Sequence, residues 1–354
     1  MSTGHPISFE KTLLMVLVPA ACLWGQSRPN ALAEASSGFA LARDGKYEQA
    51  IPHYQAAIKL DPHLPGIYLN LGLAYFKLDR FKDAAPVLEK AAKADPESFQ
   101  VQVLLGMSYF GSRRFGSAAT HLKIATQQQP DNTELRYKLA QCYLWTKQYQ
   151  AAMDEFRYLL TKDPDSAPVH MLLGEVLDAA NREDEATREF QAAIKASPRQ
   201  PEAHFGLGYL YWKQKRFAEA SRELQAELAI QPRHTQALTY LGDSEMHLGN
   251  SESALAHLRR VVKLDPNIRL AQLDLGKLLA ASHDNAAAEQ HLRAAIRLDP
   301  SQTDAHYSLG KLLLAMGRKQ EADAEFAIVK NLATQPQQEP LLDKMHGGRG
   351  DPAH

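Results

Sequence analysis

Residues 269–302 read RLAQLDLGKLLAASHDNAAAEQHLRAAIRLDPSQ, and this stretch decides the fold because the rest of the chain repeats its pattern. Gly276, Ala288 and Pro300 mark three places in it, and Leu275 stands directly before the glycine. Two segments with apolar residues at helical spacing are separated by a short polar turn. Such a stretch is expected to form a hairpin of two helices that ends at the proline, whose ring cannot continue a helix.

The three marks recur every 34 residues along the chain. The glycines are Gly38, Gly72, Gly106, Gly174, Gly208, Gly242, Gly276 and Gly310, with Ala140 in the fourth place. The alanines are Ala50, Ala84, Ala118, Ala152, Ala186, Ala220, Ala254, Ala288 and Ala322. The prolines are Pro62, Pro96, Pro130, Pro164, Pro198, Pro232, Pro266 and Pro300.

The recurring small residues predict close contact between the two helices of each hairpin. A glycine inside a helix costs about 1 kcal/mol relative to alanine, so its recurrence implies that the partner helix leaves no room for a side chain. The alanine gives the second helix a matching small surface. A large apolar residue four positions after the alanine is expected to fill the remaining space; these residues are Tyr54, Leu88, Leu122, Phe156, Phe190, Leu224, Leu258, Leu292 and Phe326.

This pattern resembles the tetratricopeptide repeat (TPR), which has glycine, alanine and proline at the eighth, twentieth and thirty-second positions of a 34-residue unit. The resemblance implies an all-α fold, a right-handed superhelical αα solenoid. Four departures concern local packing: Ala140, Glu227 at a position that is usually small, Glu245 at a position that is usually aromatic or Leu, and Thr334 with Pro336 displaced by two. The predicted repeats are 31–64, 65–98, 99–132, 133–166, 167–200, 201–234, 235–268, 269–302 and 303–336.

Composition excludes several classes of protein. The chain has 354 residues, with 40 Lys+Arg against 41 Asp+Glu, so it lacks the basic excess that nucleic-acid binding requires. It has only 2 Cys, Cys22 and Cys142, which excludes a disulfide scaffold and a cysteine-based zinc site. Cys142 stands at a repeat position that holds small residues in other copies, so we expect it to be a small buried residue. Because the basic excess is missing, we expect no nucleic-acid partner.

The chain ends differ from the repeats. Residues 12–24 form an apolar run that follows Lys11, so we expect residues 1–30 to hold a secretory signal and a short leader. A frayed extension is the alternative, and a third interpretation makes Cys22 a lipidated residue after Ala20 and Ala21. The predicted location is therefore exported, periplasmic or extracytoplasmic, with a possible lipid anchor. Residues 337–354 are expected to be a disordered tail. At the ninth repeat, exposed Ile328 and Leu332 would allow self-association, unless Leu341 and Leu342 cover them.

The histidines follow the repeat. His53, His121, His257 and His291 share the twenty-third position, and His170, His204 and His306 share the fourth, where a partly buried structural role is expected. No nucleophile motif, phosphate-binding loop or metalloprotease helix occurs. We therefore expect no catalytic residues, no metal site, no cofactor and no small-molecule substrate.

The resemblance implies that the first helices line a concave groove. There this chain carries unusually apolar residues in repeats 2 to 6, and later repeats are more polar at the same positions, with Asp243, Lys277 and Lys311. The alternative is that the apolar residues only pack against neighbouring repeats. The candidate partner-binding residues are Leu69, Leu73, Phe76, Val103, Met107, Phe110, Tyr137, Trp145, Met171, Phe205, Tyr209 and Trp212.

The predicted function is a non-catalytic scaffold or adaptor. It would bind peptide segments of partner proteins in an envelope or secretion-related complex. The alternative is a regulatory or substrate-recruiting subunit of a separate enzyme, such as a glycosyltransferase or peptidase.

Overall fold

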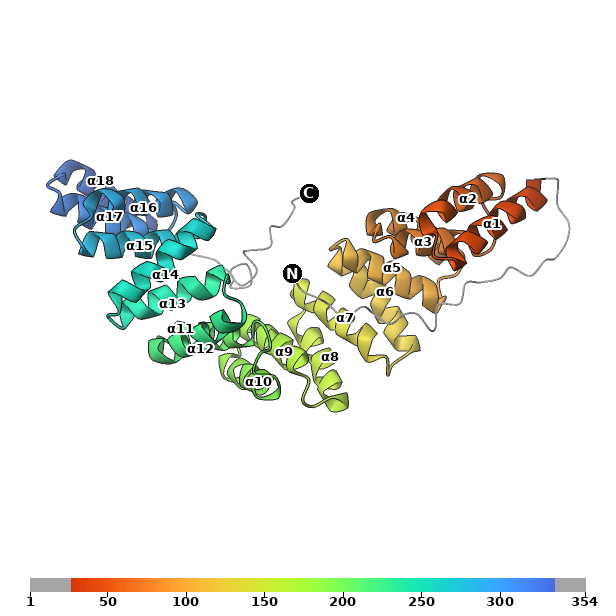
Figure 1. Cartoon of the computed structure of the whole chain (residues 1–354), viewed down its shortest axis with the longest axis horizontal. Coiled ribbons are helices and arrows are strands. Elements are labelled where there is room, and N and C mark those ends of the chain that lie inside the picture. Colours follow the sequence, from red (N-terminus) through yellow and green to blue (C-terminus); the bar gives the residue numbers. More distant parts are fainter. Residues whose placement is uncertain (1–26, 335–354) are drawn as a thin grey trace. The chain divides into compact units, whose positions relative to one another are not determined.

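The computed structural model describes residues 27–334, and it confirms the all-α prediction: eighteen helices occupy these residues, with no strand among them. They form two compact units, residues 27–162 and residues 163–334, which we call the N-terminal unit and the C-terminal unit (Figure 1). The presumed signal, Cys22 and the tail lie outside the described residues. Within residues 27–334 no helix has the length and apolar character that crossing a membrane requires.

The N-terminal unit contains four helical hairpins. Their helices are α1 (Ser27–Arg43), α2 (Tyr47–Leu60), α3 (Ile67–Lys77), α4 (Phe81–Ala94), α5 (Phe99–Gly111), α6 (Phe115–Gln128), α7 (Thr133–Trp145) and α8 (Tyr149–Lys162).

The C-terminal unit contains five helical hairpins. Their helices are α9 (Ala167–Ala179), α10 (Glu183–Ala196), α11 (Ala203–Lys213), α12 (Phe217–Ile230), α13 (Thr235–His247), α14 (Ser251–Leu264), α15 (Arg269–Ala281), α16 (Asn285–Leu298), α17 (Thr303–Ala315) and α18 (Lys319–Ala333).

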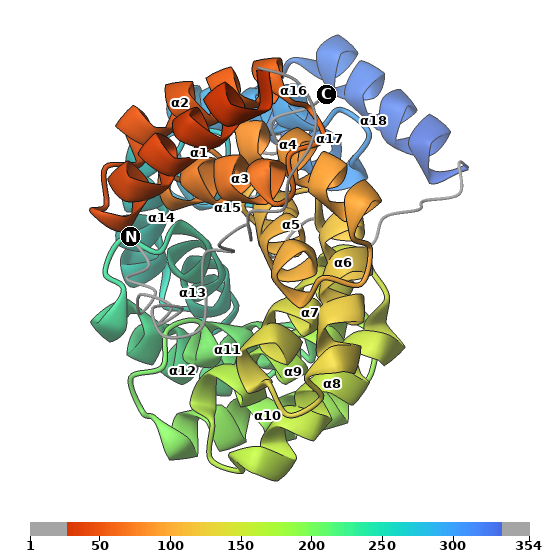
Figure 2. The same cartoon turned by 90° about the vertical axis from the view of Figure 1, so that its right-hand side faces the viewer.

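Within each unit a helix packs on the one before it and the one after it. First helices also pack on the first helices of the next hairpin, as α3 does on α5 (Figure 2). The same holds for α13 and α15. Each hairpin therefore buries its apolar surface against its neighbours in the chain, which is the defining property of a solenoid.

The predicted contact between the recurring glycine and the large apolar residue is confirmed. A Cβ built on Gly106 would lie 2.8 Å from Leu122 Cγ, and one built on Gly276 would lie 2.7 Å from Leu292 Cγ. The same clash arises in every repeat that carries the glycine. In the fourth repeat Ala140 stands there, and both Ala140 and Phe156 remain fully buried. The helices of a hairpin thus meet at van der Waals distance along this line, because one of them has no side chain there.

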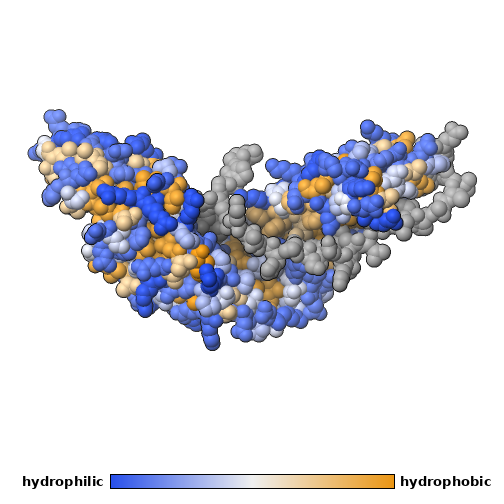
Figure 3. Space-filling view, viewed as in Figure 1, coloured by the Kyte–Doolittle hydropathy of each residue, from blue (hydrophilic) through white to orange (hydrophobic). Residues whose placement is uncertain are grey.

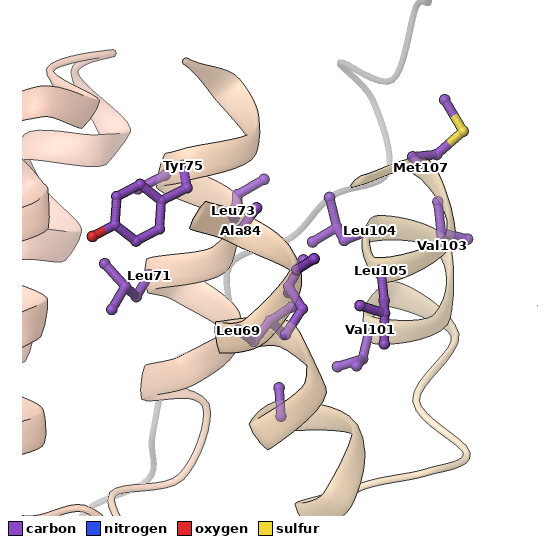
Figure 4. Close-up of a cluster of buried hydrophobic side chains, with 14 of the residues drawn as sticks. Leu69, Leu71, Leu73, Tyr75, Ala84, Val101, Val103, Leu104, Leu105 and Met107 are labelled. Atoms are coloured by element: carbon purple, nitrogen blue, oxygen red, sulfur yellow. The ribbon is translucent and has the colours of Figure 1, made fainter. Parts of the chain in front are cut away.

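The core continues from hairpin to hairpin through the first helices (Figure 4). Leu71 and Tyr75 point to one side of α3, while Leu69 and Leu73 lie on the side of α5, near Leu104. All five are at most 8 % exposed. Alternate sides of one helix are therefore buried by two different neighbours.

The turn inside each hairpin has one backbone geometry. The fifteenth residue of each repeat has a left-handed backbone conformation in all nine repeats, with φ of 76° at Gly45, 61° at Arg113 and 59° at Lys215. The next amide donates to a carbonyl five residues earlier, as Arg114 N does to Tyr109 O at 2.8 Å. This closes each first helix with a Schellman cap, and only three of the nine repeats have glycine there.

Both buried glutamates that depart from the repeat pattern have hydrogen-bond partners. Glu245 accepts from Ser253 Oγ at 2.9 Å and contacts His257 Nδ1 at 2.8 Å. The oxygens of fully buried Glu227 accept from the backbone amides of Glu202 and Phe205, at 3.1 and 3.2 Å. Glu202 precedes α11 in a left-handed conformation, with φ of 71°. Glu227 therefore caps a helix start that would otherwise leave the backbone amides of Glu202 and Phe205 without this acceptor.

Restoring the small residue of the repeat pattern with Glu227→Ala is expected to lower the free energy of unfolding by about 3 kcal/mol, because the two amides at the start of α11 lose their acceptor. Glu227→Gln keeps one acceptor and should lose less. Urea unfolding followed by circular dichroism measures both effects. A Glu227→Ala protein as stable as the wild type would contradict the capping role.

Candidate functional site

Residues 27–334 contain no group of three or more His, Cys, Asp or Glu side chains placed to hold a metal ion. Cys142 is fully buried, and burial raises the pKa of its thiol to about 12. A thiol in that environment stays protonated and unreactive at neutral pH.

The structural role predicted for the histidines is confirmed, and six of the seven belong to one type of contact; the exception is His257, which bonds Glu245 at the eleventh position of its repeat. His170 and His204, at the fourth position of their repeats, bond Glu189 and Glu223 at the twenty-third, with N–O distances of 2.6 and 2.7 Å. His121, at the twenty-third position, bonds Gln102 at the fourth, at 2.7 Å. We call the contact between the fourth and twenty-third side chains the hairpin latch. It ties the first helix of a repeat to the second.

Six of the twelve candidate partner-binding residues are buried in the described structure, with exposed fractions between 2 % and 8 %: Leu69, Leu73, Val103, Met107, Phe205 and Tyr209. Packing between repeats accounts for their apolar character, as the alternative interpretation held. Their part in partner binding stays a prediction. The other six are partly exposed: Phe76, Phe110, Tyr137, Trp145, Met171 and Trp212.

Four of the partly exposed residues, Phe76, Phe110, Tyr137 and Trp145, belong to the N-terminal unit, and we call them the aromatic surface. They come from α3, α5 and α7, the first helices of successive repeats. One second-helix residue, Phe115, supports two of the rings: it stacks on Trp145 at 5.5 Å between centroids and meets Phe110 edge-on at 5.6 Å.

A cation lies among these rings. Lys138 Nζ is 4.7 Å from the centroid of Phe110 and 5.9 Å from that of Tyr137. Burial lowers the pKa of the Lys138 ammonium, and the Glu134 carboxylate partly offsets this effect. The aromatic surface thus combines ring faces and edges with one partly desolvated positive charge. That combination suits a peptide that brings apolar side chains and an acceptor oxygen.

The C-terminal unit carries a second aromatic cluster, around α11 and α13. Tyr240 lies 4.7 Å from Trp212 and 5.1 Å from Tyr209, between ring centroids. The Trp212 indole donates to the carboxylate of Asp243, which is only 5 % exposed. Asp243 was expected on a polar stretch of the groove, and the structure instead buries it against a tryptophan.

Buried carboxylates surround this cluster. Asp178 accepts from Lys213 Nζ at 2.9 Å, and Asp274 accepts from Lys277 Nζ at 3.0 Å. Burial raises the pKa of Asp274 to about 7; the Asp243 carboxylate adds to the rise and the Lys277 ammonium opposes it. Sequence spacing did not reveal these acids as a group, because they occupy the twelfth, ninth and sixth positions of three different repeats.

The last repeat exposes apolar residues. Tyr307 and Leu314 are each 52 % exposed and Ile328 is 38 % exposed, whereas Leu332 is partly buried. Tyr307 occupies the position of Leu273, which the following repeat buries to 1 % exposure. Self-association through this end stays a prediction. Elsewhere, hydrophobic residues reach the visible face of each unit among hydrophilic ones (Figure 3).

One solved structure that resembles this chain is described as "Functional Characterization of Pseudomonas Aeruginosa pilF". It is 19 % identical in sequence, with a TM-score of 0.51, and the match covers 58 % of this chain and 93 % of the other. Another is from the "APC/C hetero-tetramer Cut9-Hcn1", with 13 % identity, a TM-score of 0.55, and coverage of 80 % of this chain and 55 % of that one. At these identities the likeness concerns the fold. A search of the curated proteins gave no match.

Family models cover most of the chain. A model described as "TPR repeat" matches residues 38–79. Models described as "Tetratricopeptide repeat" match residues 65–98, 109–176, 146–192, 171–232, 210–267 and 273–336. Together with the eighteen helices arranged as successive hairpins, these matches show that the chain belongs to the tetratricopeptide repeat family.

Proposed function

We propose that this protein is a non-catalytic interaction scaffold whose N-terminal unit binds a peptide segment of a partner through the aromatic surface. The observation that carries the proposal is that Phe76, Phe110, Tyr137 and Trp145 stay partly exposed, whereas the candidate residues Leu69, Leu73, Val103 and Met107 of the same unit are buried. Partly exposed aromatic rings held rigidly by packing are the usual anchors of protein interfaces.

The mechanism of binding follows from the contacts. Phe115 fixes the orientations of the Phe110 and Trp145 rings, so little side-chain entropy is lost when a peptide docks. Lys138 is already partly stripped of water, and an acceptor oxygen from the peptide would restore a partner to its ammonium group. The proposed ligand is therefore an apolar segment with a carboxylate or carbonyl group close to its anchor residues.

A peptide selected from a random library on the full chain tests this proposal. We expect Trp145→Ala to weaken binding of the selected peptide by about tenfold or more, because it removes an anchor ring. Leu60→Ala is the matched control, since Leu60 is a 39 % exposed apolar residue on a second helix. Equal loss in both variants, or loss in the control alone, would contradict the proposal.

We also propose that the protein is exported and acts in an envelope or secretion-related complex. The support is the apolar run at residues 12–24 with Lys11 before it, which lies outside the described residues. The N-terminus of the mature protein, read by mass spectrometry, tests the proposal. A mature chain that starts at Met1 would contradict export, and a lipid on Cys22 would show membrane anchoring.

A further inference from the structure

The hairpin latch has four chemical forms among the described residues: Glu34–His53 in repeat 1, Arg136–Glu155 in repeat 4, and two forms that each occur in more than one repeat. In repeats 5, 6 and 9 a histidine at the fourth position contacts a glutamate at the twenty-third, and the three pairs are His170–Glu189, His204–Glu223 and His306–Glu325. In repeats 3 and 8 the fourth residue is a glutamine and the twenty-third is the histidine, and the two pairs are Gln102–His121 and Gln272–His291.

Both forms also bind the preceding repeat. The fourth side chain reaches the carbonyl of the proline that ends that repeat: His204 Nε2 lies 3.2 Å from Pro198 O, and Gln272 Nε2 donates to Pro266 O at 2.8 Å. His170 and His306 reach Pro164 O and Pro300 O at 2.9 and 3.1 Å. The latch therefore joins three segments: the turn between repeats, the first helix and the second helix.

The two forms differ in the protons that they need. A carboxylate and a carbonyl oxygen only accept hydrogen bonds, so a histidine placed between them can satisfy both only when each ring nitrogen carries a proton. His204 stands in this position, between Glu223 and Pro198. In the other form the glutamine amide donates to the proline carbonyl and its oxygen accepts from His Nδ1, so a neutral histidine is sufficient.

We propose that the His204–Glu223 latch is a pH-sensitive joint between repeats 5 and 6 that holds when the imidazole is protonated and loosens when it loses that proton. The loss of one proton leaves a single N–H for two acceptors, so the ring gives up either the second helix or the turn. Acidification thus stiffens this part of the C-terminal unit.

The charges around the ring favour the protonated form. From α12 the Glu223 and Glu227 carboxylates both face His204, and the turn before α11 adds the Pro198 carbonyl. The hydrogen bond that His204 Nδ1 donates to the Glu223 carboxylate raises the pKa of His204, and burial opposes the rise. Both side chains of the pair are less than a quarter exposed, at 12 % and 23 %, so water screens the pair only in part.

In the glutamine–histidine latch the pKa of the histidine is shifted in the opposite direction. Burial lowers the pKa of His121 and of His291. The Glu89 carboxylate opposes the change at His121; at His291, Arg259 adds to it and Asp284 opposes it. Two latches of the same architecture therefore respond to pH with opposite signs.

The sign of the stability change follows from linkage. Because the folded pKa of His204 lies above its ordinary value of 6.5, its contribution is complete below pH 6.5 and is lost as the pH rises through the folded pKa. The neutral latch contributes fully above 6.5, and its contribution is lost as the pH falls.

The chain supplies its own test, because one form of the latch can be exchanged for the other. The double variant His204→Gln with Glu223→His installs in repeat 6 the pair that repeats 3 and 8 use. Hydrogen exchange of the backbone amides around residues 197–206, measured by mass spectrometry on the full chain at about pH 5.5 and about pH 8 and corrected for intrinsic rates, reports local opening.

In the wild type we expect protection to fall between the two conditions, by up to about tenfold for each unit that separates the folded pKa of His204 from 6.5. In the double variant protection should stay constant or rise with pH. The reverse exchange, Gln272→His with His291→Glu, should give repeat 8 the behaviour of repeat 6. Wild-type protection that does not fall, or an unchanged response after the exchange, would overturn the proposal.

A histidine titration followed by NMR keeps the proposal testable if the double variant folds poorly. The signal that His204→Gln removes identifies His204, and its midpoint should lie above 6.5 in the wild type. A midpoint at or below that value would reject the pH-sensitive joint without reference to any double variant.

Discussion

Gly106→Ala is expected to lower the free energy of unfolding by about 2 kcal/mol, although alanine is the better helix former. The added Cβ would lie 2.8 Å from Leu122 Cγ and 3.2 Å from the Leu122 backbone nitrogen, so the second helix must move away. Ala140 shows that a repeat can be built around alanine at this position, which is why the expected loss is moderate. Urea unfolding followed by circular dichroism measures it.

Gly116→Ala is the matched control, in the helix that follows. Nothing lies within 4 Å of a Cβ built on Gly116, and this residue is exposed. We expect the substitution to raise the free energy of unfolding by up to about 1 kcal/mol, since only the helix preference changes. Two glycine-to-alanine changes in one repeat should therefore have opposite signs. The same sign for both would show that close contact is not the reason for the recurring glycine.

Phe190→Ala should destabilise the C-terminal unit by about 4 kcal/mol. The Phe190 side chain is 1 % exposed, and it is the large residue that faces the recurring glycine of its own repeat, Gly174. It also lies against Gly206 of the next repeat, where an added Cβ would be 2.5 Å from its ring. Removing the ring therefore opens a cavity between two repeats, and neither glycine has a side chain to fill it.

Phe190→Leu also removes the aromatic ring but leaves a large apolar side chain in the space, so it separates the cost of the cavity from the cost of losing the ring. Leucine fills the equivalent position in five repeats, so we expect a cost of about 1 kcal/mol. Differential scanning calorimetry of the wild type and the two variants gives the comparison. An alanine variant that is no less stable than the leucine variant would contradict the role assigned to the ring.

The repeat architecture could be predicted because the size of the side chain is restricted at the same positions of each repeat, and because proline ends nearly every hairpin. Gly276 and Ala288 occupy places that take a small side chain, and Leu292 occupies one that takes a large apolar side chain, in all nine repeats. The hairpin latch could be predicted only in part. The sequence shows that histidines recur at the fourth and twenty-third positions, but it does not show that six of the seven bond a glutamine or glutamate at the other position; this depends on how the two helices are aligned in space.

The candidate site could be predicted only in part, because the same positions serve packing and binding. Met107 and Tyr209 look like groove residues in the sequence, and the structure buries both between repeats. Phe110 and Trp145 stay partly exposed, although Phe115 packs beside both rings. Such a difference depends on neighbours in other repeats, so the register of one repeat cannot reveal it.

The central claim, that the aromatic surface of the first helices binds the partner peptide, is tested most directly by photo-crosslinking. The photoreactive residue p-benzoylphenylalanine replaces Phe110 in one full-length protein and Leu60, on the second helix α2, in another. A peptide selected on the wild-type chain is then irradiated with each protein, and mass spectrometry identifies the products. We predict a crosslink from position 110 and none from position 60, whereas a crosslink from position 60 alone would contradict the claim.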